Sequence, residues 1–551
     1  MKALICALNT KYVHSSLAPW CLKAGIQKYS PSVKCEVLES TINEPEELIL
    51  QKILKKDFDI IGFCTYIWNV NLVLSLCRSI KKNRSIKIVL GGPEVSYNAK
   101  DILEKNSCVD YVISGEGELP FAELCGDKSI DLISGLCYRN GDEIVVRPPF
   151  ISQENPPLPY GEEYFSRLEG RIAYLETSRG CPYRCAFCLS GRCQEVRFFD
   201  TEEAKQSILA LANSGAQTIK FIDRTFNADK KRARELFLFI IDKYGSEIPE
   251  GVCFHFEIEG DILDDETIRL LSAAKAGSIQ MEIGLQSFNK DTLEAVNRKT
   301  DISRLCENIK KLIALENIHI HIDLIAGLPY ESYDSFADSF NRALELKPHV
   351  LQLGFLKLLH GSELRDRAEE YSYSFQHEPP YEVTATKWLT NEELNRLHET
   401  EDFFDRFYNS GRFLRTVEYI SKSFENAFEI YTELGAFVKA KEKTRSLDEL
   451  SWLVYECLVA HKEICADMLR DYMVLDRLAT NRTGSLPEFL KIHSPKLKEI
   501  LNLLEKDLKT KRRFGVKRAI TLLKTSNSAV WVDYDIKNPV TGQYKLNEIK
   551  I

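Results

Sequence analysis

The chain has 551 residues, which is enough for about three domains that each bury a hydrophobic core. Hydrophobic residues make up 44% and charged residues 28%, as in ordinary globular proteins, and no stretch of about 18 apolar residues predicts a membrane span. The net charge of −8 excludes a uniformly basic nucleic-acid binder. The 16 cysteines are scattered and no apolar signal segment opens the sequence, so we expect a reduced, cytoplasmic protein.

Over residues 1–146, apolar runs alternate with helical patterns, which predicts an α/β domain with a doubly wound parallel sheet. Ligands of such sheets bind beyond the carboxyl ends of the strands. The residues just after the predicted strands are therefore candidate ligand contacts: Thr65, Tyr66, Gly91, Gly92, Pro93, Glu94, Gly115 and Glu116. Glycines there allow a close approach of backbone to ligand, although simple sheet-edge turns explain the pattern equally well.

Three further regions follow along the chain. Residues 147–164 form a predicted linker, because Arg147 to Tyr160 holds five prolines in fourteen residues. Residues 165–360 contain six strand–helix repeats, which predict a partial (β/α)6 barrel with its chemistry at the carboxyl ends of the strands. Residues 361–551 are predicted to be mainly helical, with a final strand at 528–536.

Three cysteines, Cys181, Cys185 and Cys188, directly follow the first predicted strand of the central region. Three thiolates on one short loop can hold an iron–sulfur cluster and leave one iron without a cysteine ligand. A structural zinc site is the alternative, with Cys193 as the nearest further thiol, but such sites usually bring a second Cys or His pair at short spacing. The spacing therefore favours a cluster with an open iron.

This C-x3-C-x2-C spacing, with Phe187 before the third cysteine, resembles the signature of the radical S-adenosylmethionine (SAM) superfamily. The resemblance implies a [4Fe-4S] cluster whose open iron binds SAM and cleaves it to methionine and a 5′-deoxyadenosyl radical. The resemblance also assigns Phe187 to the SAM site. Similarity of "EIGLQSFNKDTLEAVNR", "IDLIAGLP" and "FHFEIEGDIL" to family motifs implies further SAM contacts at Gln286, Arg298, Asp323 and Glu257. Glu259 is close enough to be the alternative to Glu257. At 222–227 the chain has "IDRTFN" where members often carry Gly-Gly-Glu.

Strand periodicity supports a polar inner face independently of that resemblance. If Asp323 faces inward, His321 and His319 share its face, while Ile318, Ile320 and Ile322 face the helices. The same rule groups Gln280 and Glu282 with Gln286, and His255 with Glu257. Because unpaired buried polar groups cost about 1 to 3 kcal/mol each, a polar ligand is expected at this face. Each single histidine is better explained as a satisfied core residue.

The N-terminal domain, with "GGPE" and "GEGE" after its fourth and fifth strands, resembles the cobalamin-binding domain of cobalamin-dependent radical SAM enzymes. The resemblance implies that the eight candidate ligand contacts after its strands bind cobalamin. The helical C-terminal part resembles an extension of unknown function on one branch of that group. The Asp-x-His-x-x-Gly motif that supplies an axial histidine elsewhere does not occur, and His14 is a candidate exception, although a satisfied loop histidine is favoured.

The combined resemblance implies a cobalamin-dependent methyltransferase that acts on an unactivated carbon and takes electrons from a flavodoxin or ferredoxin. Rearrangement or carbon–carbon bond formation without methyl transfer stays open, and so do methylthiotransfer and a non-enzymatic sensor role. The substrate is open as well. A basic run between Lys491 and Arg518, which includes Arg512 and Arg513, matches RNA contact, but a solvated helix face is favoured.

Overall fold

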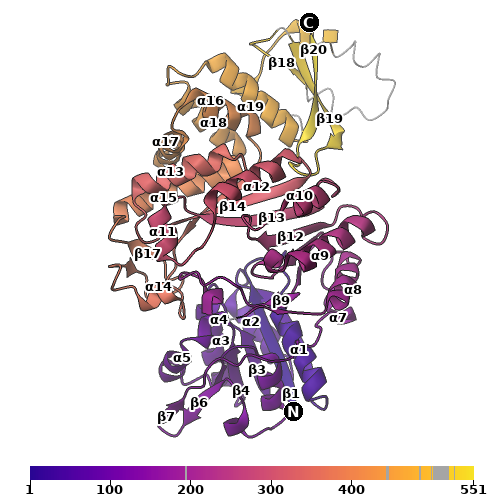
Figure 1. The fold of residues 1–551 in the computed structure, drawn as a ribbon, viewed down its shortest axis with the longest axis vertical. Helices are drawn as coiled ribbons and strands as arrows, with labels where there is room; N and C mark the ends of the chain where they lie inside the picture. The colour runs from indigo at the N-terminus through magenta and orange to yellow at the C-terminus, as the bar shows by residue number, and fades with distance from the viewer. Residues whose placement is uncertain are drawn as a thin grey trace. The chain divides into compact units, whose positions relative to one another are not determined.

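A computed structural model describes residues 1–192, 195–441, 446–482, 485–497, 499–500, 520–526 and 528–550 (Figure 1). Cys193 and most of the basic run, including Arg512 and Arg513, lie outside these residues. The chain divides into two compact units. Unit 1 comprises residues 1–282, 293–301 and 355–387, and unit 2 comprises residues 283–292, 302–354 and 388–551.

A seven-stranded sheet forms the N-terminal part of unit 1, with strand order β2-β1-β3-β4-β5-β6-β7. The strands are β1 Lys2–Asn9, β2 Lys34–Thr41, β3 Ile60–Cys64, β4 Lys87–Gly91, β5 Tyr111–Ile113, β6 Leu136–Asn140 and β7 Glu143–Val145. The first five strands run parallel, which confirms the predicted doubly wound domain. The sequence reasoning missed β6 and β7, which extend the sheet in antiparallel fashion.

Helices cover both faces of this sheet, as the nearly continuous burial of β1 requires. They are α1 Ala18–Tyr29, α2 Glu46–Leu54, α3 Val70–Asn83, α4 Pro93–Ser96, α5 Ala99–Lys105 and α6 Glu118–Cys125. The core on one face joins Leu4 and Phe63 of the strands to Ile49 of α2 and Leu76 of α3. Helices α1 and α6 pack together. The carboxyl ends of β1, β3, β4 and β5 are thereby held in one row.

The second sheet has six strands in the order β15-β14-β13-β12-β11-β8. Its strands are β8 Ile172–Leu175, β11 Thr218–Phe221, β12 Cys253–Ile258, β13 Ile279–Gln286, β14 Ile318–Ala326 and β15 Val350–Phe355. The accompanying helices are α7 Glu162–Phe165, α8 Thr201–Ala212, α9 Lys230–Lys243, α10 Asp265–Leu271, α11 Lys290–Ala295, α12 Ile302–Ala314 and α13 Tyr333–Glu345. The six predicted strand–helix repeats are confirmed. A short pair, β9 Ser178–Arg179 and β10 Arg197–Phe198, flanks the cysteine loop.

Burial alternates along these strands as the periodicity predicts. In β14, Ile318, Ile320 and Ile322 are fully buried, whereas His319, His321 and Asp323 between them are half-buried. In β12, the buried residues Phe254, Phe256 and Ile258 alternate with half-buried His255 and Glu257. One face of each strand is therefore apolar core, and the other carries the polar side chains.

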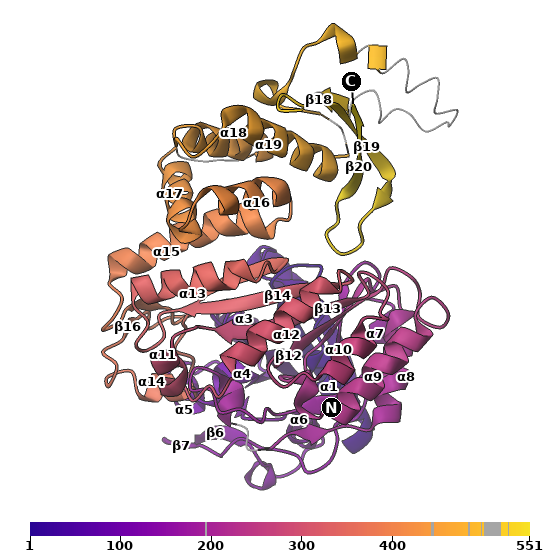
Figure 2. The ribbon, with the colours of Figure 1, turned by 45° about the horizontal axis from the view of Figure 1, so that its top comes forward.

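The C-terminal part of unit 2 is mainly helical, as expected, and ends in a small sheet (Figure 2). Its helices are α15 Asn391–Phe404, α16 Leu414–Ser423, α17 Ala427–Ala440, α18 Leu447–Leu458 and α19 Ala466–Thr480. The predicted final strand is β19 Ser528–Lys537, but it is not the last strand. It pairs with both β18 Ile520–Leu522 and β20 Tyr544–Lys550.

Residues 355–387 return to unit 1 and carry α14 Glu363–Asp366, β16 Ser374–Phe375 and β17 Val383–Ala385. The Tyr381 hydroxyl of this segment donates a hydrogen bond to Glu94, next to the Gly91-Gly92-Pro93 turn. None of the described helices combines the length and the hydrophobicity that crossing a bilayer requires.

Candidate active site

The three predicted cluster cysteines occupy a loop that begins directly after β9. Gly180 turns the chain into this loop with φ of 99°, and a Cβ there would lie 2.1 Å from the carbonyl oxygen of Glu195, so only glycine fits. Cys185 is buried, and Cys181 and Cys188 are half-buried. None of the three forms a disulfide, so all three sulfur atoms can serve as metal ligands.

A buried ion pair lies beside the most deeply placed of these thiols. Arg298 Nη1 approaches Cys185 Sγ at 3.8 Å, while its Nη2 donates to Glu259 Oε2 at 2.8 Å. The other carboxylate oxygen of Glu259, Oε1, is buried and has no hydrogen-bond partner among the residues that the structure describes. Burial raises the pKa of Glu259 to about 7, although Arg298 opposes the shift. An unsatisfied buried oxygen at this position suits a ligand with a hydrogen-bond donor.

The segment 222–227, where the sequence departs from the family pattern, positions this glutamate. Asn227 Nδ2 donates to the Glu259 carbonyl oxygen at 2.8 Å, and the Glu259 amide donates back to Asn227 Oδ1 at 2.9 Å. Thr225 Oγ1 lies 3.4 Å from Cys181 Sγ. The segment therefore contacts both the cysteine loop and the backbone of Glu259.

Glu257, which the resemblance assigns to SAM, has different neighbours. Its Oε1 lies 3.1 Å from Lys220 Nζ, and the same ammonium lies 3.1 Å from Glu282 Oε2. His255 Nε2 is 2.9 Å from that Glu282 oxygen. Of the two glutamates that the sequence left open, Glu259 adjoins Arg298, whereas Glu257 belongs to a chain of charged groups in β11, β12 and β13.

The remaining predicted SAM residues belong to the cysteine loop, β13 and β14. Phe187 is half-buried on the cysteine loop. Gln286 is the last residue of β13 and adopts a left-handed φ of 70°, with its Oε1 buried. Asp323 of β14 has an Oδ1 oxygen 2.7 Å from His321 Nε2.

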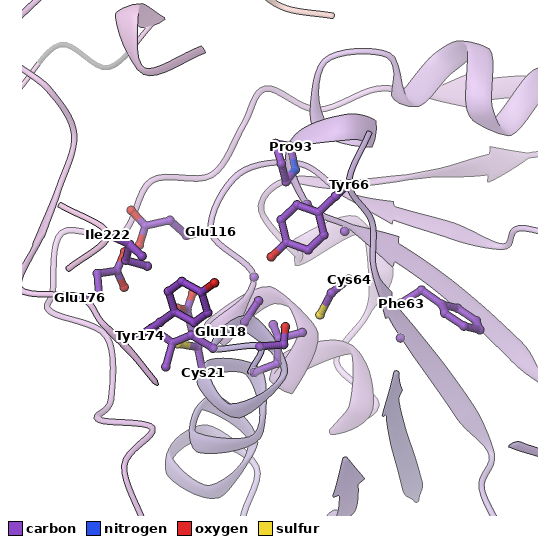
Figure 3. A pocket seen from close by; sticks show the side chains of 18 of the residues that line it. Cys21, Phe63, Cys64, Tyr66, Pro93, Glu116, Glu118, Tyr174, Glu176 and Ile222 are labelled. Atoms are coloured by element: carbon purple, nitrogen blue, oxygen red, sulfur yellow. The ribbon is translucent and has the colours of Figure 1, made fainter. Parts of the chain in front are cut away.

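A cavity of about 640 Å³ lies entirely within unit 1. Strand ends and loops at β1, β3, β4 and β5 form one part of its wall, together with α1 and α6. Residues of β8 and β12 and of the segments after β8 and β11 form another part. Figure 3 shows Glu116, Glu176 and Ile222 on one side and Tyr66, Pro93 and Cys64 on the other. The volume is typical of a small-molecule or cofactor site.

Six of the eight predicted cobalamin contacts line this cavity: Tyr66, Gly91, Gly92, Pro93, Gly115 and Glu116. Thr65 and Glu94 are outside the set of described residues that line it. Thr65 is fully buried and its amide donates to the Gly91 carbonyl oxygen at 2.7 Å. Glu94 is 5% exposed and accepts from Tyr381. These two residues are therefore placed to support the turn that forms the wall.

Sequence reasoning missed Arg179, which holds a group of carboxylates at the cavity. Its guanidinium donates to Glu116 at 2.7 Å, to Glu118 at 2.6 Å and to Glu176 at 2.8 and 2.9 Å. Burial opposes its charge, yet Glu176 and Glu118 hold the pKa of Arg179 well above the usual range. Its place directly before Gly180 and Cys181 was the only signal available in the sequence.

Aromatic side chains and His14 complete the cavity lining. Tyr66 and Trp68 stack with ring centroids 4.4 Å apart and ring planes 4° from parallel. His14 Nδ1 lies 2.8 Å from the Tyr174 hydroxyl, and burial lowers the pKa of His14. His14 thus has a protein partner at one ring nitrogen, as expected for a satisfied loop histidine.

Comparison with family models assigns three segments of the chain. Residues 4–125 match the B12 binding domain, residues 175–343 match the radical SAM superfamily, and residues 369–537 match a protein family of unknown function, DUF4080. The chain therefore carries a radical SAM domain and, before it, a B12-binding domain. These matches confirm the predicted fold class and imply a [4Fe-4S] cluster, SAM and cobalamin as cofactors.

Proteins that are similar to this chain include methyltransferases. The chain is 27% identical over 329 residues to 2-(S-pantetheinyl)-carbapenam-3-carboxylate methyltransferase from Streptantibioticus cattleyicolor. It is 28% identical over 324 residues to the cobalamin-dependent radical SAM methyltransferase TokK from Streptomyces tokunonensis. Each alignment covers 54% of this chain and 47% of the relative, so the chain spans about half the length of these relatives.

The solved structure of the cobalamin-dependent SAM radical enzyme OxsB, with aqua-cobalamin and SAM bound, shares the fold. The TM-score is 0.61 at 15% sequence identity, and the match covers 93% of this chain and 82% of OxsB.

Proposed function

We propose that this chain is a cobalamin-dependent radical SAM methyltransferase that methylates an unactivated carbon. The observation that carries the proposal is the cavity of about 640 Å³ in unit 1. Its wall combines strand ends of the B12-type sheet with Tyr174, Glu257 and the loops after β8 and β11 from the radical SAM region. A substrate in this space would contact groups from both cofactor-binding regions.

The residues present fit the three cofactors. Three free thiols at Cys181, Cys185 and Cys188 suit a cluster with one open iron. The unsatisfied Oε1 of Glu259 suits the amino group of SAM, and Arg298 holds the other oxygen, so we propose Glu259 in the place first assigned to Glu257. Phe187, Gln286 and Asp323 stay proposed SAM contacts on the resemblance alone. The cavity-lining glycines and the Tyr66–Trp68 stack suit the flat corrin ring of cobalamin.

The cluster and SAM would supply the radical that removes a hydrogen atom from the substrate, and cobalamin would carry the methyl group. The chain's own residues orient these groups and limit access of water. Arg179 fixes the carboxylates of Glu116, Glu118 and Glu176 on one side of the cavity. Asn227 fixes the backbone of Glu259 beside the cysteine loop.

Radical SAM enzymes need a reductant. We further propose that a flavodoxin or ferredoxin supplies the electron and that the protein acts in the cytoplasm. The substrate stays open. RNA is the less favoured class, because its only support is a basic run that lies mostly outside the described residues.

The test is SAM turnover by the full chain, reconstituted anaerobically with cluster, cobalamin and reductant. Formation of both 5′-deoxyadenosine and S-adenosylhomocysteine, separated by liquid chromatography, is expected. Cys185→Ser should lose 5′-deoxyadenosine formation, whereas the matched variant Cys465→Ser, at an exposed thiol in unit 2, should keep it.

The other outcomes decide between the alternatives. Formation of 5′-deoxyadenosine without S-adenosylhomocysteine would replace methyl transfer by rearrangement or carbon–carbon bond formation. An iron content of two clusters per chain would favour methylthiotransfer. No SAM cleavage under strong reduction would favour a sensor.

A further inference from the structure

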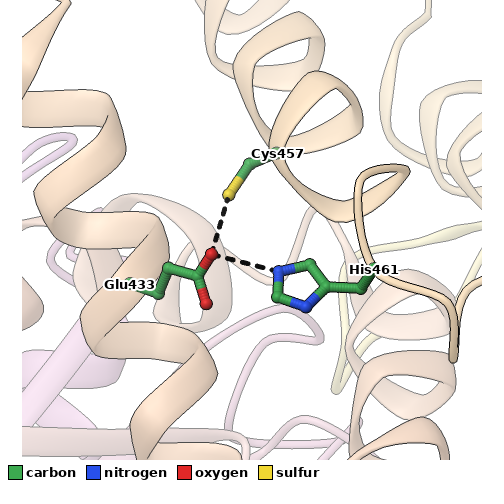
Figure 4. Close-up of side chains that lie close together, drawn as sticks. All are labelled: Glu433, Cys457 and His461. Carbon is green, nitrogen blue, oxygen red and sulfur yellow. Dashed lines mark hydrogen bonds and ion pairs between the residues drawn. The ribbon is translucent and has the colours of Figure 1, made fainter.

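A second group of metal-ligating side chains lies in the helical part of unit 2, within the segment that matches DUF4080. Glu433 lies on α17, Cys457 on the last turn of α18, and His461 just after that helix ends. Figure 4 shows the Cys457 thiol and the His461 imidazole pointing at the same carboxylate oxygen of Glu433. Glu433 Oε1 lies 3.1 Å from His461 Nε2 and 3.9 Å from Cys457 Sγ.

These three donor atoms are close enough to share one ion. Each lies within 4.8 Å of the other two. With zinc–sulfur distances of about 2.3 Å and zinc–nitrogen or zinc–oxygen distances of about 2.1 Å, the ligand atoms of a tetrahedral site are separated by about 3.4 to 3.6 Å. The observed separations of 3.1 and 3.9 Å bracket that range, so small side-chain rotations bring the donors into position.

The donor set also has the right chemistry and exposure. A thiolate, an imidazole and a carboxylate are the three side-chain ligands that zinc takes in proteins. Cys457 is 5% exposed, whereas the His461 and Glu433 side chains are 24% and 50% exposed. The buried thiol therefore forms the base of the group, and the two exposed ligands leave an entry path and a position for water.

We propose that Glu433, Cys457 and His461 form a binding site for a divalent transition-metal ion of the zinc type, which joins α17 to α18. The thiolate and carboxylate together balance the charge of the ion, and the thiol proton is released to solvent on binding. The site is separate from the cysteine loop of unit 1 and shares no ligand with it. It does not rest on the proposed methyl transfer.

Its experimental test uses Co²⁺ as a spectroscopic probe for the full chain. The background is the triple variant Cys181→Ala, Cys185→Ala and Cys188→Ala, because those thiols would otherwise compete for the ion. Anaerobic titration should give about one Co²⁺ per chain with a thiolate-to-cobalt charge-transfer band. Cys457→Ser should lose the band, and Glu433→Gln and His461→Ala should weaken binding by at least about tenfold.

Two matched controls are available in the same unit. Cys465→Ser removes an exposed thiol outside the group. His493→Ala removes a histidine that pairs with Glu488 at 3.0 Å but, among the described residues, is not grouped with a cysteine. Both variants should bind Co²⁺ like the parent.

A folding readout keeps the result decisive. Zn²⁺ should raise the thermal unfolding midpoint of the triple variant. At the same Zn²⁺ concentration it should raise the midpoint less when Glu433→Gln is added, and the exposed Glu433 side chain can be replaced without disturbing the core. Failure of the parent to bind Co²⁺, or equal binding by the three ligand variants, would overturn the site and leave a histidine–glutamate pair beside a buried thiol. Neither result would affect the proposed methyl transfer.

Discussion

The two buried arginines of unit 1 differ in how completely their partners are satisfied. Arg179 meets three carboxylates, and each of these carboxylates receives a guanidinium hydrogen bond. Arg298 meets the single carboxylate of Glu259, one of whose oxygens finds no hydrogen-bond partner in the described part of the chain. The Arg179 network, in which every carboxylate is hydrogen-bonded, supports the cavity wall. The Arg298–Glu259 pair beside the cysteine loop leaves one acceptor oxygen for a ligand.

The two networks also differ in the pKa of their carboxyl groups. Burial raises the pKa of Glu118, but the Arg179 guanidinium outweighs this effect and holds that pKa below its ordinary value. Burial raises the pKa of Glu259 to about 7 despite Arg298. The charge of Glu259, whose Oε1 has no hydrogen-bond partner among the described residues, is thus costly, and a cationic ligand group would relieve that cost.

Replacing Arg179 should have the largest effect on stability. Arg179→Met leaves three carboxylates close together with their main counter-ion removed, which costs about 3 to 5 kcal/mol. Denaturant unfolding measures this loss directly. Arg197→Met is the matched control, because Arg197 pairs with Glu116 alone in this group and should cost less. Equal stability of Arg179→Met and the parent would contradict a supporting role.

Two neighbouring glycines of the cavity wall, Gly91 and Gly92, differ in whether the backbone leaves room for a side chain. Gly92 has φ of 118°, and a Cβ there would lie 2.4 Å from the Thr65 carbonyl oxygen, so Gly92→Ala should cost about 1 to 3 kcal/mol. At Gly91 the nearest atom to an added Cβ is 3.8 Å away. Gly91→Ala should keep the fold, and because Gly91 lines the cavity it should reduce cobalamin retention.

Optical spectra of the bound corrinoid and unfolding midpoints, measured on both glycine variants, check this prediction. Equal destabilisation by the two substitutions would show that the left-handed φ of Gly92 is not what the turn requires.

Replacing Glu259 should change SAM binding rather than the fold. Glu259→Gln keeps the shape but removes the charge, so SAM affinity should fall at least about tenfold, which corresponds to about 1.4 kcal/mol. Glu257→Gln is the control, because Glu257 pairs with Lys220 instead of Arg298. Anaerobic calorimetry on cluster-reconstituted protein measures the SAM affinity of both variants. If only Glu257→Gln lost SAM affinity, Glu257 rather than Glu259 would be the SAM contact.

The sequence could reveal the parts of this site that depend on local spacing. The three cysteines lie within eight residues, so their loop is visible without a fold. Strand alternation placed His255 with Glu257, and Asp323 with His321, because each group lies in one strand. Strand alternation could not place Glu259, because β12 ends at Ile258 and the alternation of side chains between the two faces holds only within a strand.

Groups assembled from distant segments could not be predicted in this way. Arg179 gathers Glu116 and Glu118, which are more than sixty residues earlier in the chain. Glu433 meets Cys457 and His461 only because α17 packs against α18. The antiparallel strands β6 and β7 are short and only partly apolar, so their pattern does not distinguish them from a loop.

The smallest expected effect is on the pH dependence of folding stability in protein without cluster or SAM. Glu259 and Glu118 should contribute to it in opposite directions. The folded-state pKa of Glu259, about 7, exceeds its ordinary value of 4.5, so the stability it contributes is full below pH 4.5 and is lost as pH rises through 7. The lowered pKa of Glu118 gives stability that is present above pH 4.5 and is lost as pH falls below it.

Unfolding free energies of the parent and two variants between pH 4 and 8 separate these contributions. The parent minus Glu259→Gln difference should decline between about pH 4.5 and 7, by at most about 1.4 kcal/mol per pH unit. The parent minus Glu118→Gln difference should stay level there and decline only on the acid side. Because both glutamates pair with a buried arginine, parallel declines in the same window would mean that the missing partner of Glu259 Oε1 does not distinguish the two networks.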